Sequence, residues 1–283
     1  MSWTQLPDVP VARSTCCGAY ADGKFYVMAG HDGYFNSSYS RVDVWDGSSW
    51  SQAPSLPKSM LNSGGTADSD GNVYCLGGRN GGFGSHSVAY KYDGSSWSSL
   101  PNIPSSEDRE DATATNGNVY VTGGSTLCRW DGSSWTDLGS PPNSRQRAAV
   151  ASDNSGNVYI LGGYSGSPSP SVEMWDGSSW STEPSMNIGR QSFTAVSDDD
   201  GNIYVMGGNT TNAGTGPSAE KYDGNQWSIL PDMNVGRRQY AGAVSASGQI
   251  FVGGGYTGSH TAAAETGSFS SPVAPSNLSV TVI

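Results

Sequence analysis

One short motif recurs along the whole chain of 283 residues: an aromatic residue, Asp-Gly, two polar residues and Trp. WDGSSW occupies 45–50 and returns unchanged at 130–135 and 175–180, with the close copies YDGSSW at 92–97 and YDGNQW at 222–227. The closing Trp residues follow one another at intervals of 47, 38, 45 and 47 residues. A repeat of this length indicates that each copy belongs to one supersecondary unit of a repeat architecture.

A second marker, an apolar segment that ends in a pair of small residues, has the same period. Its six copies finish at Gly30, Gly78, Gly124, Gly163, Gly208 and Gly254. Each unit also begins with a run of small residues, followed by a turn such as DGK or DGN. Asp-Gly is a strong hairpin signal because Gly tolerates a positive φ. We therefore expect four short antiparallel strands in every unit.

Four-stranded antiparallel units at this period are typical of propeller blades. The Gly pair after an apolar strand, the aromatic-Asp turn and the Trp that closes it resemble the kelch repeat family rather than WD repeats. The resemblance implies an all-β fold, a six-bladed kelch-type β-propeller over residues 1–269. The opening SWTQLP resembles outer strands such as SWSQAP. We therefore expect the N-terminal strand to complete the last blade.

The last segment, residues 270–283, falls outside the repeats. Its prolines and its alternating NLSVTV predict a linker or the start of a further β module, with a surface tail as the alternative. Such a segment would connect the propeller to a larger assembly.

Composition excludes several classes of partner. The net charge is −11 with only 14 Lys and Arg residues, so a basic footprint for nucleic acid is not expected. No apolar run is long enough for a membrane span, and the first residues do not resemble a secretion signal. The four cysteines form no CxxC or metal-ligand spacing, which predicts buried thiols. Few lysines and many small polar residues favour an extracellular, cell-surface or virion location over a cytoplasmic one.

The irregular segments of the six units are expected on one face. Because successive strands are antiparallel, the start of each first strand and the loop after each Gly pair lie on the same side. Binding residues usually lie on such loops. The loops contain His31, His86 and His260, which form either a metal or catalytic cluster or three solvated loop residues. Because no compact ligand motif accompanies them, we predict no metal and no cofactor.

Four arginines at the start of first strands occur in units whose third strand has an acid. The pairs are Arg13 with Asp43, Arg145 with Glu173, Arg190 with Glu220, and Arg237 with Glu265. The second unit has Met60 and Tyr90 instead and so lacks both partners. Because the arginine and the acid occur together or are both absent, we predict a buried ion pair inside the unit. A buried charge without its partner would destabilise the fold by about 3–5 kcal/mol.

The remaining arginines and the loop aromatics form our predicted ligand site. Its members are Tyr34, Phe35, Arg79, Phe83, Arg109, Arg147, Tyr164, Arg238 and Tyr256. Aromatic residues together with Arg are typical of recognition surfaces for sugars and peptides. The alternative is that these arginines are simply exposed and the aromatics pack on one another.

Two functions are consistent with these patterns. The favoured one is a non-catalytic recognition module that binds a glycan or a protein partner through its variable loops. The alternative is a sugar-active enzyme on the same face, similar to sialic acid mutarotase or to the copper enzyme galactose oxidase, both of which are kelch propellers. No motif of galactose oxidase matches residue by residue, so no catalytic residue is assigned.

Overall fold

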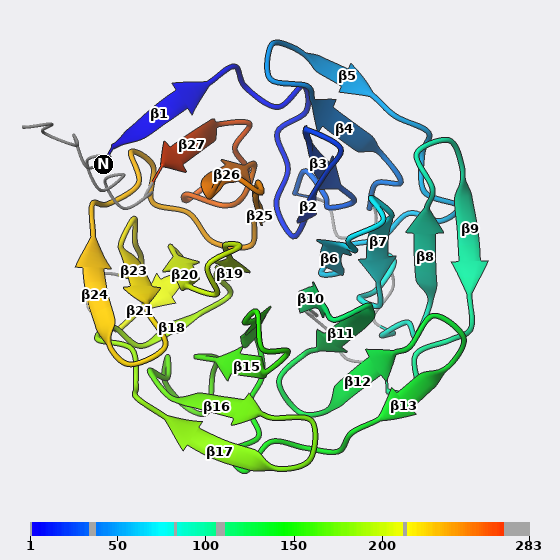
Figure 1. Ribbon diagram of the computed structural model, residues 1–283. Helices are drawn as coiled ribbons and strands as arrows, with labels where there is room; N and C mark the ends of the chain where they lie inside the picture. Colours follow the sequence, from blue (N-terminus) through cyan, green and yellow to red (C-terminus); the bar gives the residue numbers. More distant parts are fainter. Residues whose placement is uncertain (1, 34–37, 82–83, 106–110, 212–213, 269–283) are drawn as a thin grey trace, which may run out of the picture.

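The fold is built from β-strands around a central axis (Figure 1). The computed structural model describes residues 2–33, 38–81, 84–105, 111–211 and 214–268. Within these ranges there are strands and turns but no helix. It follows that the described part of the chain offers no helix with the length and hydropathy needed to cross a membrane.

The described strands form six four-stranded antiparallel sheets and one small three-stranded sheet. From the axis to the rim, the first sheet contains β2 (Cys17–Ala21), β3 (Lys24–Met28), β4 (Val42–Trp45) and β5 (Trp50–Gln52). The second sheet contains β6 (Gly64–Ala67), β7 (Val73–Leu76), β8 (Ala89–Tyr92) and β9 (Trp97–Leu100). The third sheet contains β10 (Asp111–Thr115), β11 (Asn118–Thr122), β12 (Leu127–Trp130) and β13 (Trp135–Asp137). The fourth sheet contains β14 (Ala149–Ser152), β15 (Val158–Leu161), β16 (Val172–Trp175) and β17 (Trp180–Glu183). The fifth sheet contains β19 (Thr194–Ser197), β20 (Ile203–Met206), β23 (Ala219–Tyr222) and β24 (Trp227–Leu230). The sixth sheet contains β25 (Ala241–Val244), β26 (Gln249–Gly253), β27 (Ala264–Ser268) and β1 (Trp3–Leu6). The small sheet contains β18 (Arg190–Gln191), β21 (Asn209–Thr210) and β22 (Gly214–Thr215).

The innermost strands consist of small residues because neighbouring sheets converge on the axis. A Cβ atom added to Gly18 would lie 2.8 Å from the backbone nitrogen of Gly242, and one added to Gly65 would lie 2.6 Å from the carbonyl oxygen of Gly18. Such distances exclude larger side chains unless the backbone moves. The small-residue first strands therefore lie where the sequence predicts them.

Apolar side chains fill the space between neighbouring sheets. One cluster joins the first sheet, through residues such as Phe25 and Val27, to the last sheet, through Ala241 and Phe251. The rings of Phe25 and Phe251 stack with centroids 5.6 Å apart. Packing therefore links the first and last sheets of the chain, as it links consecutive ones.

The repeated Asp-Gly motif forms the hairpin that joins the third and fourth strands of a unit. In its first copy the Asp46 Oδ1 atom accepts hydrogen bonds from the backbone N–H groups of Ser48 and Ser49, both at 2.8 Å. These bonds lower the pKa of Asp46 to about 2. Gly47 has a φ of 96°, which glycine adopts without strain. The flanking Trp45 and Trp50 are paired across the two strands.

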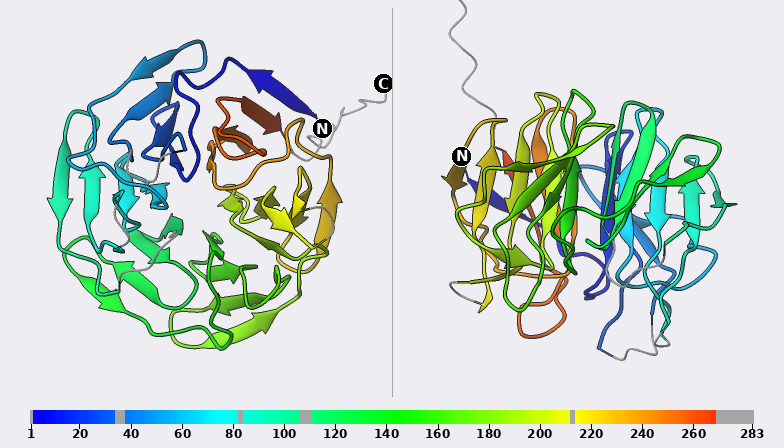
Figure 2. Two further views of the ribbon diagram at one scale, coloured as in Figure 1. Left: turned by 180° about the vertical axis from the view of Figure 1, so that it is seen from behind. Right: turned by 90° about the horizontal axis from the view of Figure 1, so that it is seen from below.

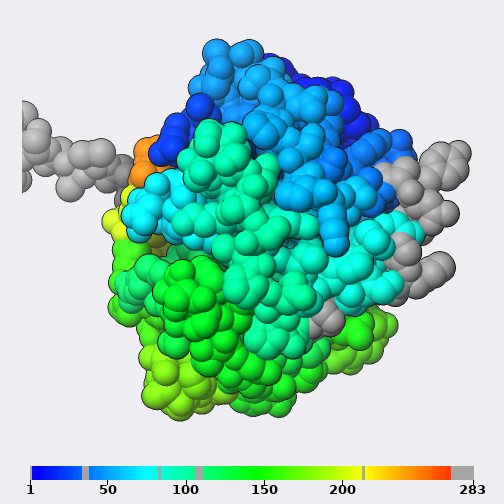
Figure 3. Space-filling model, turned by 90° about the vertical axis from the view of Figure 1, so that its right-hand side faces the viewer, coloured from blue at the N-terminus to red at the C-terminus, as the bar shows by residue number. Residues whose placement is uncertain are grey.

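The closing Trp of the motif bonds to a neighbouring sheet at the rim. Trp97 Nε1 donates to the carbonyl oxygen of Pro54 at 2.9 Å, and Trp227 Nε1 donates to that of Pro184 at 2.8 Å. Figure 3 shows successive segments of the chain packed side by side along this rim. Trp50, Trp135 and these two residues thus connect their sheets to the preceding one.

The N-terminal strand lies in the sheet formed by the end of the chain. β1 pairs with β27 in antiparallel register, from Trp3 opposite Gly267 to Leu6 opposite Ala264. Trp3 Nε1 donates to the carbonyl oxygen of Pro231 at 3.0 Å, a bond equivalent to those of Trp97 and Trp227. The first and last described residues lie close together at the rim (Figure 2). The predicted tail, 270–283, lies outside the described residues.

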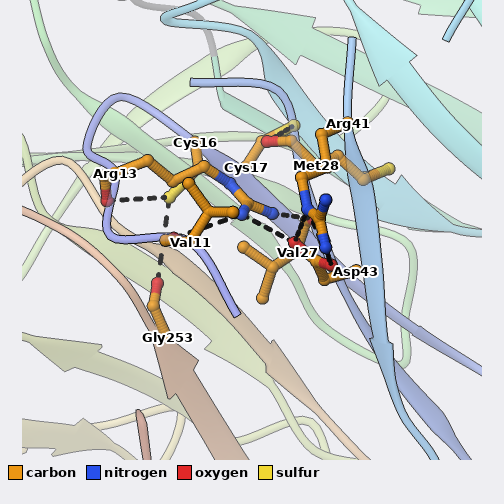
Figure 4. Close-up of polar contacts among 9 residues, drawn as sticks. All are labelled: Val11, Arg13, Cys16, Cys17, Val27, Met28, Arg41, Asp43 and Gly253. Atoms are coloured by element: carbon orange, nitrogen blue, oxygen red, sulfur yellow. Dashed lines mark hydrogen bonds and ion pairs between the residues drawn. The ribbon is translucent and has the colours of Figure 1, made fainter. Parts of the chain in front are cut away.

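The four predicted ion pairs are present and buried. Arg13 Nη1 lies 2.7 Å from Asp43 Oδ2, and both side chains are fully buried (Figure 4). The equivalent pairs Arg190–Glu220 and Arg237–Glu265 also have distances of 2.7 Å, and Arg145 pairs with Glu173. Met60 and Tyr90 are buried in the second unit, as expected for an apolar replacement. Each of these arginines is therefore neutralised inside its own sheet.

The cysteines are buried free thiols, as predicted. Cys16 and Cys17 point into different apolar clusters, as adjacent residues near the start of a strand do. The Sγ atoms of Cys17 and Cys75 lie 3.7 Å apart across two neighbouring sheets. This proximity and burial raise the pKa of the Cys17 thiol.

Candidate functional site

The loops after the Gly pairs lie next to the starts of the first strands. Isolated β-bridges join Ser14 to His31 and Arg238 to Tyr256. Each bridge brings a residue that follows a Gly pair beside a residue that precedes a first strand. Both sets of segments therefore lie on one face around the axis, as the strand directions predict.

A ring of strained residues surrounds the axis on this face. Five equivalent non-glycine residues have φ between 54° and 60°: Thr15, Asn62, Arg147, Ser192 and Gln239. Their backbones are hydrogen-bonded from one unit to the next: Ser192 N to Arg147 O at 3.1 Å, Gln239 N to Ser192 O at 3.0 Å, Thr15 N to Gln239 O at 2.7 Å, and Asn62 N to Thr15 O at 2.8 Å. We call these five residues the axial ring.

The residues of the axial ring have an unfavourable backbone conformation. A left-handed backbone conformation is unfavourable for a residue with a Cβ atom, and most so for a β-branched residue such as Thr15. Backbone strain of this kind persists where surrounding structure enforces it, and it clusters at binding and active sites. In the axial ring, the hydrogen bonds between units enforce this conformation.

A polar pocket of about 430 Å³ opens at the axial ring. All five ring residues line it, together with His31, Arg79, Asn209, Arg238, Tyr256 and His260. These side chains come from segments far apart in the sequence. The volume lies within the range of small-molecule binding sites, about 300–1,000 Å³. We call this cavity the axial pocket.

Two arginines of the axial pocket are oriented by amide oxygens and by tyrosine rings. Arg147 Nη1 donates to Gln191 Oε1 at 3.0 Å, and its guanidinium lies 5.6 Å from the centre of the Tyr164 ring. Arg238 Nη1 donates to Asn209 Oδ1 at 3.0 Å, and its guanidinium lies 4.8 Å from the centre of the Tyr256 ring. Cation–π stacking and neutral acceptors hold both groups in place without cancelling their charge.

Two histidines converge at the wall of the axial pocket. The rings of His31 and His260 meet edge to face with centroids 4.8 Å apart, and the His260 ring lies 5.6 Å from that of Tyr256. Burial lowers the pKa of both histidines, and the mutual repulsion and nearby Arg79 lower that of His31 further. The negative charge of the exposed Asp32 partly offsets this effect, because it raises the pKa of both histidines. Both rings are therefore uncharged at neutral pH.

Below the axial pocket the channel narrows. A constriction of about 70 Å³ shares the axial ring with the pocket and leads to a second cavity, about 490 Å³, on the opposite face. Asp111 lines both of these lower cavities and accepts backbone N–H bonds from Ala112 and Val150, each at 3.0 Å. Desolvation of this half-buried carboxyl group raises the pKa of Asp111 to about 7.

The structure brings part of the predicted ligand site together. Arg79, Arg147, Arg238 and Tyr256 line the axial pocket, and the exposed Tyr164 lies beside Arg147 outside the cavity lining. That they bind a ligand stays a prediction. Tyr34, Phe35, Phe83 and Arg109 lie outside the described residues.

The predicted alternatives for the histidines are now distinguished in part. His31 and His260 converge, whereas His86 does not line the axial pocket. Within the described ranges, no group of three or more His, Cys, Asp or Glu side chains is arranged to hold a metal ion.

Sequence reasoning missed most of the axial ring. Thr15, Asn62, Ser192 and Gln239 have no distinctive chemistry, and no motif marks them. A positional signal was present, because Thr15, Ser192 and Gln239 each follow an ion-paired arginine by two residues. Aligning the units on those arginines identifies the ring.

Comparisons with known proteins agree with the fold. Residues 12–57 and 145–187 match the family model described as the Kelch motif, which confirms the resemblance to kelch repeats. The solved structures that match include one titled "Structure of YjhT", with a TM-score of 0.75 and 16% sequence identity over 92% of this chain and 95% of that chain. At this identity the likeness shows the fold alone. No curated protein matches the chain.

Proposed function

We propose that this kelch-repeat protein is a non-catalytic recognition module that binds a glycan or a protein partner through its loop face, with the axial pocket as the ligand site. The observation that carries the proposal is that residues from distant parts of the sequence meet at one cavity. Cationic and aromatic residues of the predicted ligand site, together with two histidines, surround one cavity at the axial ring. Loops held on a rigid scaffold are the usual place for recognition.

The proposal includes a specific architecture. We take the six four-stranded sheets as six blades over residues 1–269, closed into a ring by the pairing of β1 with β27. We take 270–283 as a linker or the start of a further β module that would connect the propeller to a larger assembly. A recognition module of this kind is expected on a cell surface or a virion.

A sugar is the better-supported ligand class for the axial pocket. The lining supplies hydroxyl, amide, guanidinium and imidazole groups, which match the alternating donors and acceptors of a sugar. Most glycoside hydrolases need two carboxyl groups across the scissile bond. The described lining of the axial pocket holds no carboxylate. These features favour binding over hydrolysis.

The first prediction tests the pocket. Labelled protein is applied to a glycan array, and the affinity of the strongest glycan is measured by calorimetry. Arg147→Ala and Arg238→Ala should each weaken binding at least tenfold, because each removes a cation at the wall of the pocket, and each should lower the melting temperature by no more than a few degrees.

Lys58→Ala is the matched control for this prediction. Lys58 is an exposed cation just before a first strand and does not line the axial pocket. Its removal should leave affinity unchanged. Equal affinity of wild type, R147A and R238A for every glycan bound would refute the pocket as the ligand site.

A second candidate function, a sugar-active enzyme, is favoured by the histidine pair. Uncharged imidazoles in a sugar-sized pocket are suited to general acid–base catalysis. An NMR assay of sugar anomer exchange tests this candidate. If the protein accelerates anomer exchange and both His31→Gln and His260→Gln abolish this acceleration, the protein is an enzyme. If anomer exchange has the same rate with and without the protein, catalysis of that reaction is excluded.

A further inference from the structure

We infer that Cys17 and Cys75 are an oxidation site, at which hydrogen peroxide forms a disulfide that joins the first sheet to the second. Cys17 lies on β2 and Cys75 on β7. Their Sγ atoms are 3.7 Å apart, although the two residues are separated by 58 positions in the sequence. The packing of one sheet on the next therefore produces the contact. This inference does not depend on the ligand of the axial pocket.

The other units show that packing at this position does not require sulfur. Cys17 and Cys75 belong to one apolar cluster between their sheets. At two other boundaries between sheets, the equivalent positions hold a small residue and a branched one: Ala149 with Val205, and Ala241 with Val27. An alanine and a valine thus fill the same space. Two thiols in contact add a chemical capacity that these apolar pairs lack, because they can form a covalent bond.

Gly65 leaves the space in which the two thiols meet. It is the strand partner of Cys75, and a Cβ atom built on it would lie 3.0 Å from the Cβ of Cys17. Strand partners place their Cβ atoms on the same face of a sheet, about 4.5–5.5 Å apart. Cys17 therefore lies against the missing side chain of Gly65 and beside Cys75. Because the S–S bond is about 2.0 Å long, we expect both side chains to rotate toward each other when it forms.

A small oxidant has a route to one of the two thiols. Cys17 lines the constriction below the axial ring and is 5% exposed, whereas Cys75 is 0% exposed and does not line it. The constriction has a volume of about 70 Å³. A water molecule occupies about 30 Å³ in the liquid, so hydrogen peroxide fits and the disulfide of glutathione does not. We therefore assign Cys17 as the thiol that reacts first.

One peroxide molecule balances the reaction. The Cys17 thiolate attacks a peroxide oxygen, the O–O bond breaks, and the departing hydroxide takes up the thiol proton, which leaves a sulfenic acid and water. The Cys75 sulfur then attacks the sulfenic sulfur. The S–S bond forms as the hydroxyl group leaves with the Cys75 proton as a second water. In total the two thiols lose two electrons and two protons, and the peroxide is reduced to two waters.

The surroundings of Cys17 set the pH dependence of the first step. The contact with Cys75 and the burial of the thiol raise the pKa of Cys17 well above its usual value, and the nearby Cys16 and Asp111 act in the same direction. Only the thiolate attacks peroxide. Oxidation should therefore be slow at neutral pH and should accelerate as the pH rises.

Oxidation of the reduced full chain with hydrogen peroxide tests the inference. After removal of peroxide, a digest made without reductant should contain the Cys17 and Cys75 peptides linked to each other. The oxidised protein should melt about 5 °C or more above the reduced one, because the bond closes a long loop of the unfolded chain. Dithiothreitol should reverse both changes, since it reduces a disulfide but not a sulfinic or sulfonic acid.

Three variants define the pair. Cys17→Ala and Cys75→Val copy residues of other units, so both should fold, and neither should gain the reversible rise in melting temperature. Cys16→Ala is the matched control. Cys16 also lines the constriction, but its Sγ atom lies against the carbonyl oxygens of Arg13 and Gly253 (Figure 4). C16A should form the same linked peptides as the wild type.

A second oxidant tests the route. Oxidised glutathione should link the peptides at least about tenfold more slowly than hydrogen peroxide at the same concentration, because it is too large for the constriction. If both oxidants act equally fast, entry through the constriction is wrong.

The remaining outcomes decide the assignment itself. If peroxide oxidises the methionines of the chain but yields no linked Cys17 and Cys75 peptides, the inference is refuted. Linked peptides that contain Cys16 instead of Cys17 would overturn the pairing. If the Cys17–Cys75 bond forms without raising the melting temperature, it does not stabilise the junction of the two sheets.

Discussion

Neighbouring arginines in this protein have opposite environments. Arg237 points into its own sheet and pairs with Glu265, whereas Arg238 points into the axial pocket. The partner of Arg237 could be predicted, because the second unit lacks arginine and acid together. The partner of Arg238 could not, because Asn209 belongs to the preceding unit and is brought close only by the packing of one sheet on the next.

The buried ion pairs make a prediction at the residue scale. Glu220→Gln should lower the free energy of unfolding by about 3–5 kcal/mol, because it leaves the fully buried Arg190 without a carboxylate. Glu220 also accepts backbone N–H bonds from Asn187 and Ile188, which adds to the loss. Urea denaturation measures the change.

Two variants serve as controls for Glu220→Gln. Asp232→Asn removes an exposed acid and should change stability by less than about 0.5 kcal/mol. The double variant R190M/E220Y copies the Met60 and Tyr90 of the second unit, leaves no buried charge and should be more stable than E220Q. If E220Q is as stable as wild type, the pair is not needed for stability.

The hairpin at each rim shows what a repeat predicts about an element and what it does not. The Asp-Gly pair predicts the turn from local geometry alone. The role of the closing Trp was missed in part, because its hydrogen bond reaches a proline in the preceding unit: Trp97 bonds to Pro54. Long-range contacts of this kind depend on how sheets pack, which no short motif records.

Trp180 permits a matched test of the rim hydrogen bond. The outer strand of the preceding unit is followed by Leu138-Gly139, whereas the other outer strands are followed by a proline that accepts the Trp bond. The described residues show no hydrogen bond from Trp180 Nε1. Trp97→Phe should therefore cost about 1 kcal/mol more than Trp180→Phe, since both lose similar apolar area but only W97F loses a hydrogen bond. If urea denaturation shows that the two variants lose the same free energy of unfolding, the rim hydrogen bond does not contribute to stability.

At the scale of the whole molecule, the four-stranded antiparallel sheets could be predicted because each copy of the repeat contains the same local signals. The face that carries the irregular loops followed from strand direction. The axial pocket could not be predicted, since its volume and the approach of His31 to His260 depend on the tilt of the sheets about the axis. Those quantities depend on how the sheets pack against one another.

The pairing of β1 with β27 makes a prediction at this scale. Deleting residues 2–8 removes the outer strand of one sheet and exposes the edge of β27. The loss of the strand and of the buried Trp3 should amount to several kcal/mol, which lowers the melting temperature by about 10 °C. Calorimetry measures the shift.

A sequence exchange controls for the deletion. Replacing WTQL of β1 by WSSL of β9 keeps the strand and its Trp while changing two exposed side chains, Thr4 and Gln5. This variant should melt near wild type. A truncated protein as heat-resistant as the exchanged one would mean that β1 does not close the ring.

In the axial ring, the main chain connects neighbouring units, and the five residues also line the axial pocket. Main-chain atoms connect Arg147, Ser192, Gln239, Thr15 and Asn62 from one unit to the next, so none of these five side chains is needed for the connection. Their chemistry is accordingly free to change while the ring persists. A combinatorial library at these five positions should consequently yield many folded proteins with new selectivity, which makes this small scaffold a starting point for evolving receptors.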